Sequence, residues 1–288
     1  MPQTTDLCRL EQAATNKKNS NTTTMKLETL ISCMHQKDAY IASRSNVKTD
    51  CVIVNQCDAD SSASQPYIDA IGNSHNLKFI STTERGLSSS RNMAIKNSTG
   101  DICLIMDDDE ILDDNYESTI LNAYLLYPDA DVIAFKVRNL EKNYIASPKK
   151  LSYLGVLRVS SDEITFRRDS VTAKGITFDT EMGSGTGHGS GEEVAFLYSC
   201  LRKGLTVRYV PEYISTLDPN SDSQWFKGFT SRFFLERGWA TARYMGKPMA
   251  ILYALYYTIR KHKFYSKDCT FGSALAYTLK GIFMKSLP

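Results

Sequence analysis

The fold of this chain is decided by the stretch Asp101-Ile102-Cys103-Leu104-Ile105-Met106-Asp107-Asp108-Asp109-Glu110. Five apolar residues follow Asp101 without polar alternation, which predicts a strand that is covered on both faces. Four acids stand directly at the carboxyl end of that strand. In an open α/β sheet, ligands bind in the crevice outside the carboxyl ends of the strands. Because crowded carboxylates repel one another, the run predicts a site for a divalent cation or a cationic ligand.

Apolar runs and helical patterns alternate along the chain around this strand. The expected strands cover residues 27–34, 51–54, 77–80, 102–106, 132–137, 162–168 and 207–210. The expected helices cover residues 38–46, 67–71, 113–127 and 192–203, with a further one after the Gly- and Ser-rich loop 84–92. This alternation indicates parallel βαβ units with right-handed crossovers, and hence an α/β fold.

The charge of the chain is unevenly distributed. The net charge of +2 over 288 residues divides into −6 for the first 221 residues and +8 from residue 222 onward. The basic part is rich in aromatic residues and predicts helices over residues 249–263 and 271–285. A basic, aromatic extension on an acidic body favours contact with an anionic surface, either phospholipid or nucleic acid, although a solvated basic face explains the charge as well.

Composition divides the chain into three segments and excludes some classes of protein. Residues 1–24 are polar and lack apolar periodicity, so we expect a disordered tail, followed by a catalytic domain over 25–221 and the basic extension over 222–288. The seven cysteines form no C-x-x-C pair, which argues against zinc or dithiol chemistry. The longest apolar run, residues 249–259, is shorter than the ~20 residues that span a bilayer.

Several kinds of site place acids in such a pattern. An EF-hand loop fails at Ile111 and Leu112, where that motif requires different residues. A haloacid-dehalogenase-type phosphatase has its acids near the start of the domain, whereas about three strands precede them here. Prenyl synthase acids need helical neighbours, but residues 102–106 predict a strand. A D-x-D of the kind found in glycosyltransferases, formed by Asp107 and Asp109, remains.

Motifs on either side of the acids form a more specific pattern. They are Gly86-Leu87-Ser88-x-x-Arg91-Asn92-x-Ala94-Ile95, Thr99-Gly100-Asp101, Ile105-Met106-Asp107-Asp108-Asp109 and Gly191-Glu192-Glu193-x-x-Phe196. In this combination the chain resembles the nucleotide-sugar-dependent glycosyltransferases of family 2. The resemblance implies a GT-A fold, a mixed sheet flanked by helices. Its C-terminal helical extension is similar to the tails of bacterial members that build surface polysaccharides.

The resemblance also implies roles for individual residues. Asp107 and Asp109 would hold Mg²⁺ or Mn²⁺ on the donor diphosphate, in keeping with the oxygen ligands that these cations prefer. Glu193 occupies the place of the catalytic base, where Asp is commoner in the family, and Glu192 stands beside it. Direct attack on the anomeric carbon would then invert its configuration and require a single base.

Donor recognition is expected from residues at the ends of the strands and in the adjoining loop. Asn55 and Gln56 stand where the family usually has an acidic pair that recognises the base. The residues expected to bind the donor are Gln56, Asp58, Arg85, Arg91, Asp107 and Asp108, with a UDP-sugar as the favoured donor. The segment 183–191 has five glycines in nine positions and is interpreted as an active-site lid or a linker. His188 in this segment could supply a further metal ligand, but an exposed loop residue is the preferred interpretation.

The expected protein is therefore an inverting, metal-dependent glycosyltransferase. It would be cytoplasmic, peripheral on the inner face of the cell membrane through residues 222–288, and act on a saccharide or lipid-linked saccharide rather than on nucleic acid. Two alternatives stay open at this point. One is a phosphotransferase or nucleotidyltransferase that uses the same acids, and the other is a non-catalytic protein that binds nucleotide sugars at the membrane.

Overall fold

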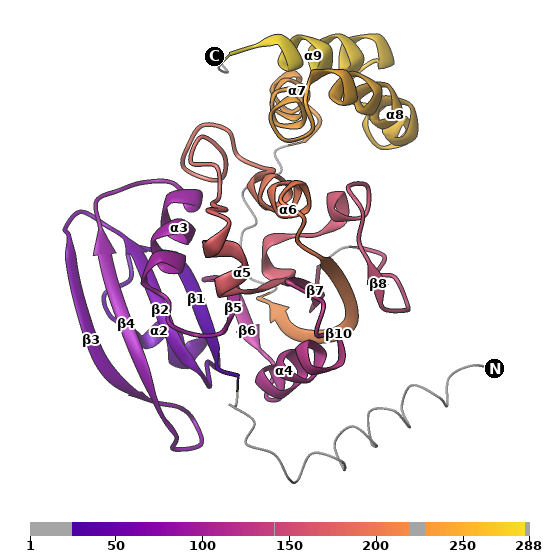
Figure 1. The fold of residues 1–288 in the computed structure, drawn as a ribbon. Coiled ribbons are helices and arrows are strands. Elements are labelled where there is room, and N and C mark those ends of the chain that lie inside the picture. Colours follow the sequence, from indigo (N-terminus) through magenta and orange to yellow (C-terminus); the bar gives the residue numbers. More distant parts are fainter. Residues whose placement is uncertain (1–24, 141, 219–227, 286–288) are drawn as a thin grey trace.

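The structure, a computed structural model, describes residues 25–140, 142–218 and 228–285. In these ranges ten strands form one mixed sheet in the order β3-β4-β2-β1-β5-β9-β7-β10-β6, with β8 paired to β10 (Figure 1). The strands are β1 Leu27–Met34, β2 Asp50–Gln56, β3 Ser61–Ile68, β4 Ser74–Thr82, β5 Ile102–Asp107, β6 Glu110–Leu112, β7 Val132–Arg138, β8 Lys149–Lys150, β9 Ile164–Arg167 and β10 Val207–Leu217. The helices are α2 Tyr40–Arg44, α3 Leu87–Asn97, α4 Tyr116–Leu126, α5 Arg168–Ala173, α6 Glu192–Arg202, α7 Ser231–Met245, α8 Lys247–Tyr265 and α9 Phe271–Phe283. This is the α/β architecture that was expected, a mixed sheet flanked by helices and followed by a helical extension.

The parallel strands β4, β2, β1 and β5 align their carboxyl ends at one edge of the sheet. Asp107 at the end of β5 lies opposite Ser32 of β1, and Gln56 at the end of β2 lies between Met34 and Thr82. The strands β1, β2 and β5 are almost wholly buried, because helices cover both faces of the sheet. The continuous apolar run 102–106 is therefore a central strand, as predicted.

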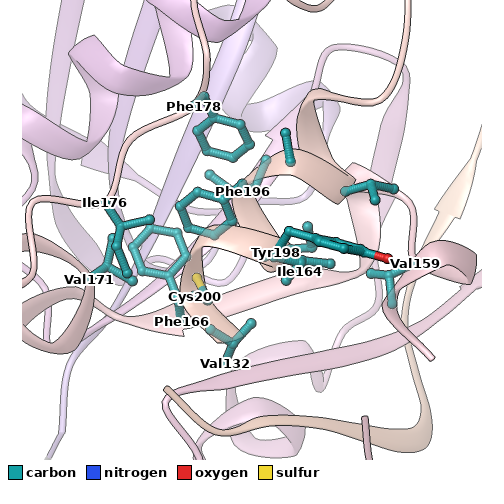
Figure 2. Close-up of a cluster of buried hydrophobic side chains, with 14 of the residues drawn as sticks. Val132, Val159, Ile164, Phe166, Val171, Ile176, Phe178, Phe196, Tyr198 and Cys200 are labelled. Atoms are coloured by element: carbon teal, nitrogen blue, oxygen red, sulfur yellow. The ribbon is translucent and has the colours of Figure 1, made fainter. Parts of the chain in front are cut away.

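Two apolar cores lie on the two faces of the sheet. One contains buried residues of α2 and α4, such as Ile41 and Ile120. The other lies beneath α3 and α6 and includes a cluster that Figure 2 shows in detail, in which the rings of Phe178 and Phe196 stack at 4.4 Å between centroids. Phe196 belongs to the motif Gly191-Glu192-Glu193-x-x-Phe196, so the helix that carries Glu192 and Glu193 is fixed to the core through its buried face.

The helical extension packs as a unit beyond α6 (Figure 1). Helices α7 and α9 approach each other closely at two glycines. A Cβ atom on Gly238 would lie 2.0 Å from the carbonyl oxygen of Thr278, and one on Gly281 would lie 2.1 Å from that of Leu235. Only glycine fits at such a backbone contact. Among the described residues, no helix combines the length and the apolar character that crossing a membrane requires.

Several expectations about local structure are wrong or incomplete. The helix expected over 67–71 does not form, because residues 61–68 make the edge strand β3, which pairs antiparallel with β4. The strands are not all parallel, since β9 runs antiparallel to both β5 and β7. The last helix of the body begins as expected at Glu192, but α4 begins at Tyr116 without a side-chain cap. The tail expected over 1–24 lies outside the described residues.

Candidate active site

Arg91 of α3 connects the acids of β5 to the first turn of α6. One terminal nitrogen of its guanidinium donates to both carboxylate oxygens of Asp107, at 3.0 and 2.9 Å, and the other donates to Oε1 of Glu192 at 3.0 Å. Arg91 is only 1% exposed, so its guanidinium is buried where it bonds to the two carboxylates. Charge-assisted bonds of this kind are strong in a buried setting. The bridge fixes the spacing between the D-x-D and the Glu192-Glu193 pair.

The acidic cluster contains one residue that the sequence did not single out as a site residue. Asp162 lies just before β9, which runs antiparallel to β5 with Thr165 opposite Leu104, so the chain at Asp162 returns to the end of β5. Burial raises the pKa of Asp162, and the charges of Asp107 and Asp109 raise it further. The fold therefore brings Asp162 close enough to Asp107 and Asp109 for their charges to act on it.

The other acids of the run have different environments. Glu110 is buried and accepts a hydrogen bond of 2.7 Å from the Ser215 hydroxyl, and burial raises its pKa. This hydrogen bond links the end of the acidic run to β10. Burial and the charge of Asp107 also raise the pKa of Asp108, whose carbonyl oxygen accepts a bond of 2.7 Å from Arg44. The backbone carbonyl of Asp109 accepts a bond from the Asp218 amide at 2.8 Å.

A divalent cation suits this arrangement if the donor supplies part of its ligands. Among the described residues, no three His, Cys, Asp or Glu side chains are grouped so that they could hold a metal by themselves. Mg²⁺ in nucleotide enzymes is commonly held by one or two carboxylates together with phosphate oxygens and water. Asp107 and Asp109 can supply those carboxylates, and the mutual repulsion of Asp107, Asp109 and Asp162 favours a cation there.

Glu192 and Glu193 form the first turn of α6 and differ in their environments. Glu192 is buried and paired with Arg91, as described above. Burial, and then the neighbouring charge of Glu192, raises the pKa of Glu193. Gly191 precedes them with φ of 99°, a conformation that favours glycine, and a Cβ there would lie 3.2 Å from the Met182 side chain. The tight turn at Gly191 thus places the Glu193 carboxylate at the start of the helix.

The glycine-rich segment 183–191 connects the start of α3 with the helical extension. The backbone amide of Leu87 donates to the carbonyl oxygen of Ser184 at 2.9 Å, which holds the segment against the first motif. His188 stacks on Trp239 of α7, with ring centroids 4.0 Å apart. His188 was expected to be an exposed loop residue, but it is partly buried in this contact. Its Nδ1 is buried without a hydrogen-bond partner among the described residues.

The remaining residues expected to bind the donor lie at the carboxyl edge of β2 and in the loop beside it. Arg85 donates to the exposed Asp58 at 2.8 Å and to the carbonyl oxygen of Cys57 at 2.8 Å. Oε1 of Gln56 accepts a bond of 2.8 Å from the Gly86 amide, so this side chain orients the loop that begins α3. Asn55 bonds through both side-chain atoms to the backbone of Gln36 at 2.9 Å. Asn55 and Gln56 thus hold the backbone of neighbouring segments in place at this edge of the sheet.

Comparison with known proteins agrees with this geometry. Residues 27–186 match the model of the family described as glycosyl transferase family 2. Among solved structures, residues 1–349 of S. aureus TarS superpose with a TM-score of 0.58 at 14% identity, covering 90% of this chain and 81% of that one. The same fragment in complex with UDP-GlcNAc superposes with a TM-score of 0.56 at 14% identity, covering 85% and 74%.

A search of the curated proteins finds no match. The structural likeness, at such low identity, establishes the GT-A fold and nothing finer. The match to the family extends over more than half of the 288 residues and includes the acids of β5 and the motif that begins α3. The chain therefore belongs to glycosyl transferase family 2 and is a glycosyltransferase.

Proposed function

We propose that the protein is an inverting, metal-dependent glycosyltransferase that moves a sugar from a nucleotide-diphosphate donor to a saccharide or lipid-linked saccharide. The observation that supports this most is the Arg91 bridge, because it holds the carboxylate pair at the start of α6 beside the D-x-D at the end of β5. A site for the donor diphosphate and a carboxylate base for the acceptor are the two parts that this chemistry needs.

The donor would bind along the carboxyl edge of β2 and β5. Asp107 and Asp109 would hold Mg²⁺ or Mn²⁺, which supplies positive charge to the departing diphosphate. The Arg85 and Asp58 pair, Gln56 and Asp108 lie at this edge and would contact the nucleotide or the sugar. We favour a UDP-sugar, and the complex of S. aureus TarS with UDP-GlcNAc supports this choice of donor class.

Glu193 would act as the base. Its carboxylate takes the proton of an acceptor hydroxyl while the hydroxyl oxygen attacks the anomeric carbon from the face opposite the diphosphate. The new glycosidic bond forms as the bond from the anomeric carbon to the diphosphate oxygen breaks, and both electrons of that bond leave with the nucleoside diphosphate. Glu192 is kept in place by Arg91, and its charge makes Glu193 a stronger base by disfavouring loss of its proton to water.

The cellular role belongs to the same proposal. A catalytic domain over residues 25–221 would be followed by the basic extension over 222–288. The enzyme would work in the synthesis of a cell-surface polysaccharide, in the cytoplasm and peripherally on the inner face of the membrane. The net charge of +8 from residue 222 onward supports an anionic contact surface for the extension.

Two substitutions test the mechanism. Asp109→Ala should abolish transfer and the dependence on Mn²⁺ while the fold is kept, because Asp109 is partly exposed and lies outside the apolar cores. Glu193→Gln should keep donor binding but lower transfer by roughly 10²-fold or more, as expected for a general base. Glu117→Gln, on the exposed start of α4, is the matched control and should leave transfer unchanged.

The assay follows release of nucleoside diphosphate and formation of the glycoside together. A panel of UDP-, GDP- and ADP-sugars with Mn²⁺ in thermal-shift measurements would first identify the nucleotide of the donor. Normal turnover of Glu193→Gln would exclude Glu193 as the catalytic base. Release of inorganic phosphate without sugar transfer would favour the phosphotransferase alternative instead.

A further inference from the structure

Helix α8 exposes its large apolar residues and buries its small ones. On its outer side, Met249, Leu252, Tyr256 and Ile259 are 53%, 59%, 61% and 65% exposed. On its inner side, Ala250, Ala254 and Thr258 are buried against the neighbouring helices. A surface helix of a globular protein normally has the reverse distribution. We define these four exposed residues as the outer face of α8.

The outer face forms a continuous stripe. Its residues recur at intervals of three and four positions, which places them on one side of an α-helix. Phe283 of α9 is also exposed and lies beside Lys247, whose Nζ is 5.5 Å from its ring centroid. A further exposed aromatic ring thus lies beside the first residue of α8. Contiguous exposed patches of this kind mark sites of interaction with other molecules or membranes.

Basic residues surround this stripe. Helix α8 contains four Lys and Arg residues and no Asp or Glu. Lys263 continues the spacing of the outer face by one further step, and Arg260 follows Ile259 directly. Both side chains are exposed, and Lys267 adds a further exposed cation after the helix. Large apolar residues bordered by cations are the composition of helices that lie in the interface of anionic membranes.

We propose that the outer face of α8 docks on the surface of an anionic phospholipid bilayer, with the helix axis in the plane of the headgroups. The apolar side chains would enter the acyl boundary, while Arg260, Lys263 and Lys267 would contact lipid phosphates. A second copy of this chain fits less well, because its α8 has no Asp or Glu to pair with the cations at the end of this helix, whereas lipid phosphates would pair with them. Nucleic acid fits less well too, because its phosphate backbone offers no apolar surface on which Leu252 and Ile259 could be buried.

This membrane contact narrows the peripheral location proposed above and does not depend on the transfer reaction. Helix α7 packs between α8 and α6, so docking of α8 would hold the body of the enzyme at the bilayer surface. Trp239 of α7 contacts His188 in the segment that precedes the catalytic pair. An acceptor with a lipid anchor would then be presented to the enzyme in the same plane.

Vesicle flotation with the full chain tests the proposal without any donor or acceptor. The probe is a vesicle of phosphatidylcholine with 30% phosphatidylglycerol, compared with phosphatidylcholine alone, at a NaCl concentration of about 0.1 M. The wild type should float with the anionic vesicles and bind at least tenfold more weakly to the neutral ones. The variant Leu252→Glu/Ile259→Glu should lose binding at least tenfold. The control Ile68→Glu/Ile71→Glu alters two equally exposed residues of the β3–β4 hairpin and should bind as the wild type does.

A second variant, Arg260→Glu/Lys263→Glu, keeps the apolar stripe and should also weaken binding, because each cation near the surface contributes separately. Circular dichroism and melting temperature confirm that both variants fold. Failure of the wild type to bind, equal binding to the two kinds of vesicle, or full binding by Leu252→Glu/Ile259→Glu would overturn the proposal. A dimer that light scattering detects and that Leu252→Glu/Ile259→Glu dissociates would also overturn it. Loss of sugar transfer with intact flotation would count against the proposed function alone.

Discussion

Replacement of Arg91 by methionine tests the central contact of the site. Methionine keeps much of the length of the side chain but removes the guanidinium that bonds to Asp107 and Glu192. Since Arg91 is 1% exposed and Glu192 is 6% exposed, at least one carboxylate would stay buried without its cation. Breaking a buried ion pair by removing one partner costs about 3–5 kcal/mol. We therefore expect Arg91→Met to lower the free energy of unfolding by about that amount.

Thermal unfolding measures this loss. About 2–4 °C per kcal/mol applies to domains of this size, so the melting temperature should fall by about 6–20 °C. The matched control is Arg85→Met, because Arg85 pairs with the exposed Asp58 and such a pair is worth less than about 1 kcal/mol. The double variant Arg91→Met/Glu192→Gln should recover part of the loss, since it removes one of the two carboxylates left without a partner.

A fall of less than about 2 °C in Arg91→Met would refute the reasoning, because the bridge would then contribute no more than a surface pair. Failure of the double variant to recover stability would show that the loss comes from packing rather than charge. The cycle of the two single variants and the double variant separates these cases, because it isolates the coupling between the two residues. Arg91→Met should also lose transfer, as the pair at the start of α6 would no longer be held beside Asp107.

Three further predictions concern catalysis, charge and packing. Transfer should rise with pH as Glu193 loses its proton, because the pKa of Glu193 is raised in the folded enzyme. Glu192→Gln should move this rise to lower pH, because it removes the neighbouring charge. Initial rates from pH 5 to 9 measure both profiles, and an unchanged profile in Glu192→Gln would contradict the assignment. Asp162→Asn removes one negative charge beside the D-x-D, so it should raise the melting temperature in the absence of a cation. It should also weaken the binding of Mn²⁺ in the presence of UDP, which calorimetry measures. Unchanged affinity for Mn²⁺ would place the cation elsewhere. Gly281→Ala should lower the free energy of unfolding by about 1–3 kcal/mol, because its Cβ would meet a carbonyl oxygen of α7 at 2.1 Å. The control Gly272→Ala lies in the same helix, meets nothing within 4 Å and should be neutral or stabilising. Equal melting temperatures of the two variants would mean that α7 and α9 can move apart at no cost.

The central strands could be predicted from the sequence, and the edge of the sheet could not. Residues 102–106 are apolar without interruption because both faces of β5 are covered, and that pattern is local in the sequence. Residues 61–68 are exposed except at Tyr67, and they include three serines and a proline, so their composition gives little indication of a strand. They are extended because β4 offers them an antiparallel partner. That partner is a tertiary effect, which propensity and periodicity do not contain.

The site shows the same limit more sharply. The motif spacing pointed to Asp107, Glu192 and Glu193, since each stands at the end of an element that the sequence predicts. It placed Arg91 among the residues that bind the donor, and the structure gives it two carboxylates that are 16 and 101 residues away.

Asp162 did not stand out for a related reason. It follows Asp107 by 55 positions in the sequence, and only the antiparallel return of β9 brings it back to the end of β5. Charges brought together in this way must be balanced by a partner from outside the run of acids. Arg91 bonds to Asp107 and Glu192, while burial and then the charges of Asp107 and Asp109 raise the pKa of Asp162. A cation bound with the donor diphosphate would neutralise part of the charge of these aspartates, so we expect donor and metal to bind to this enzyme cooperatively rather than independently.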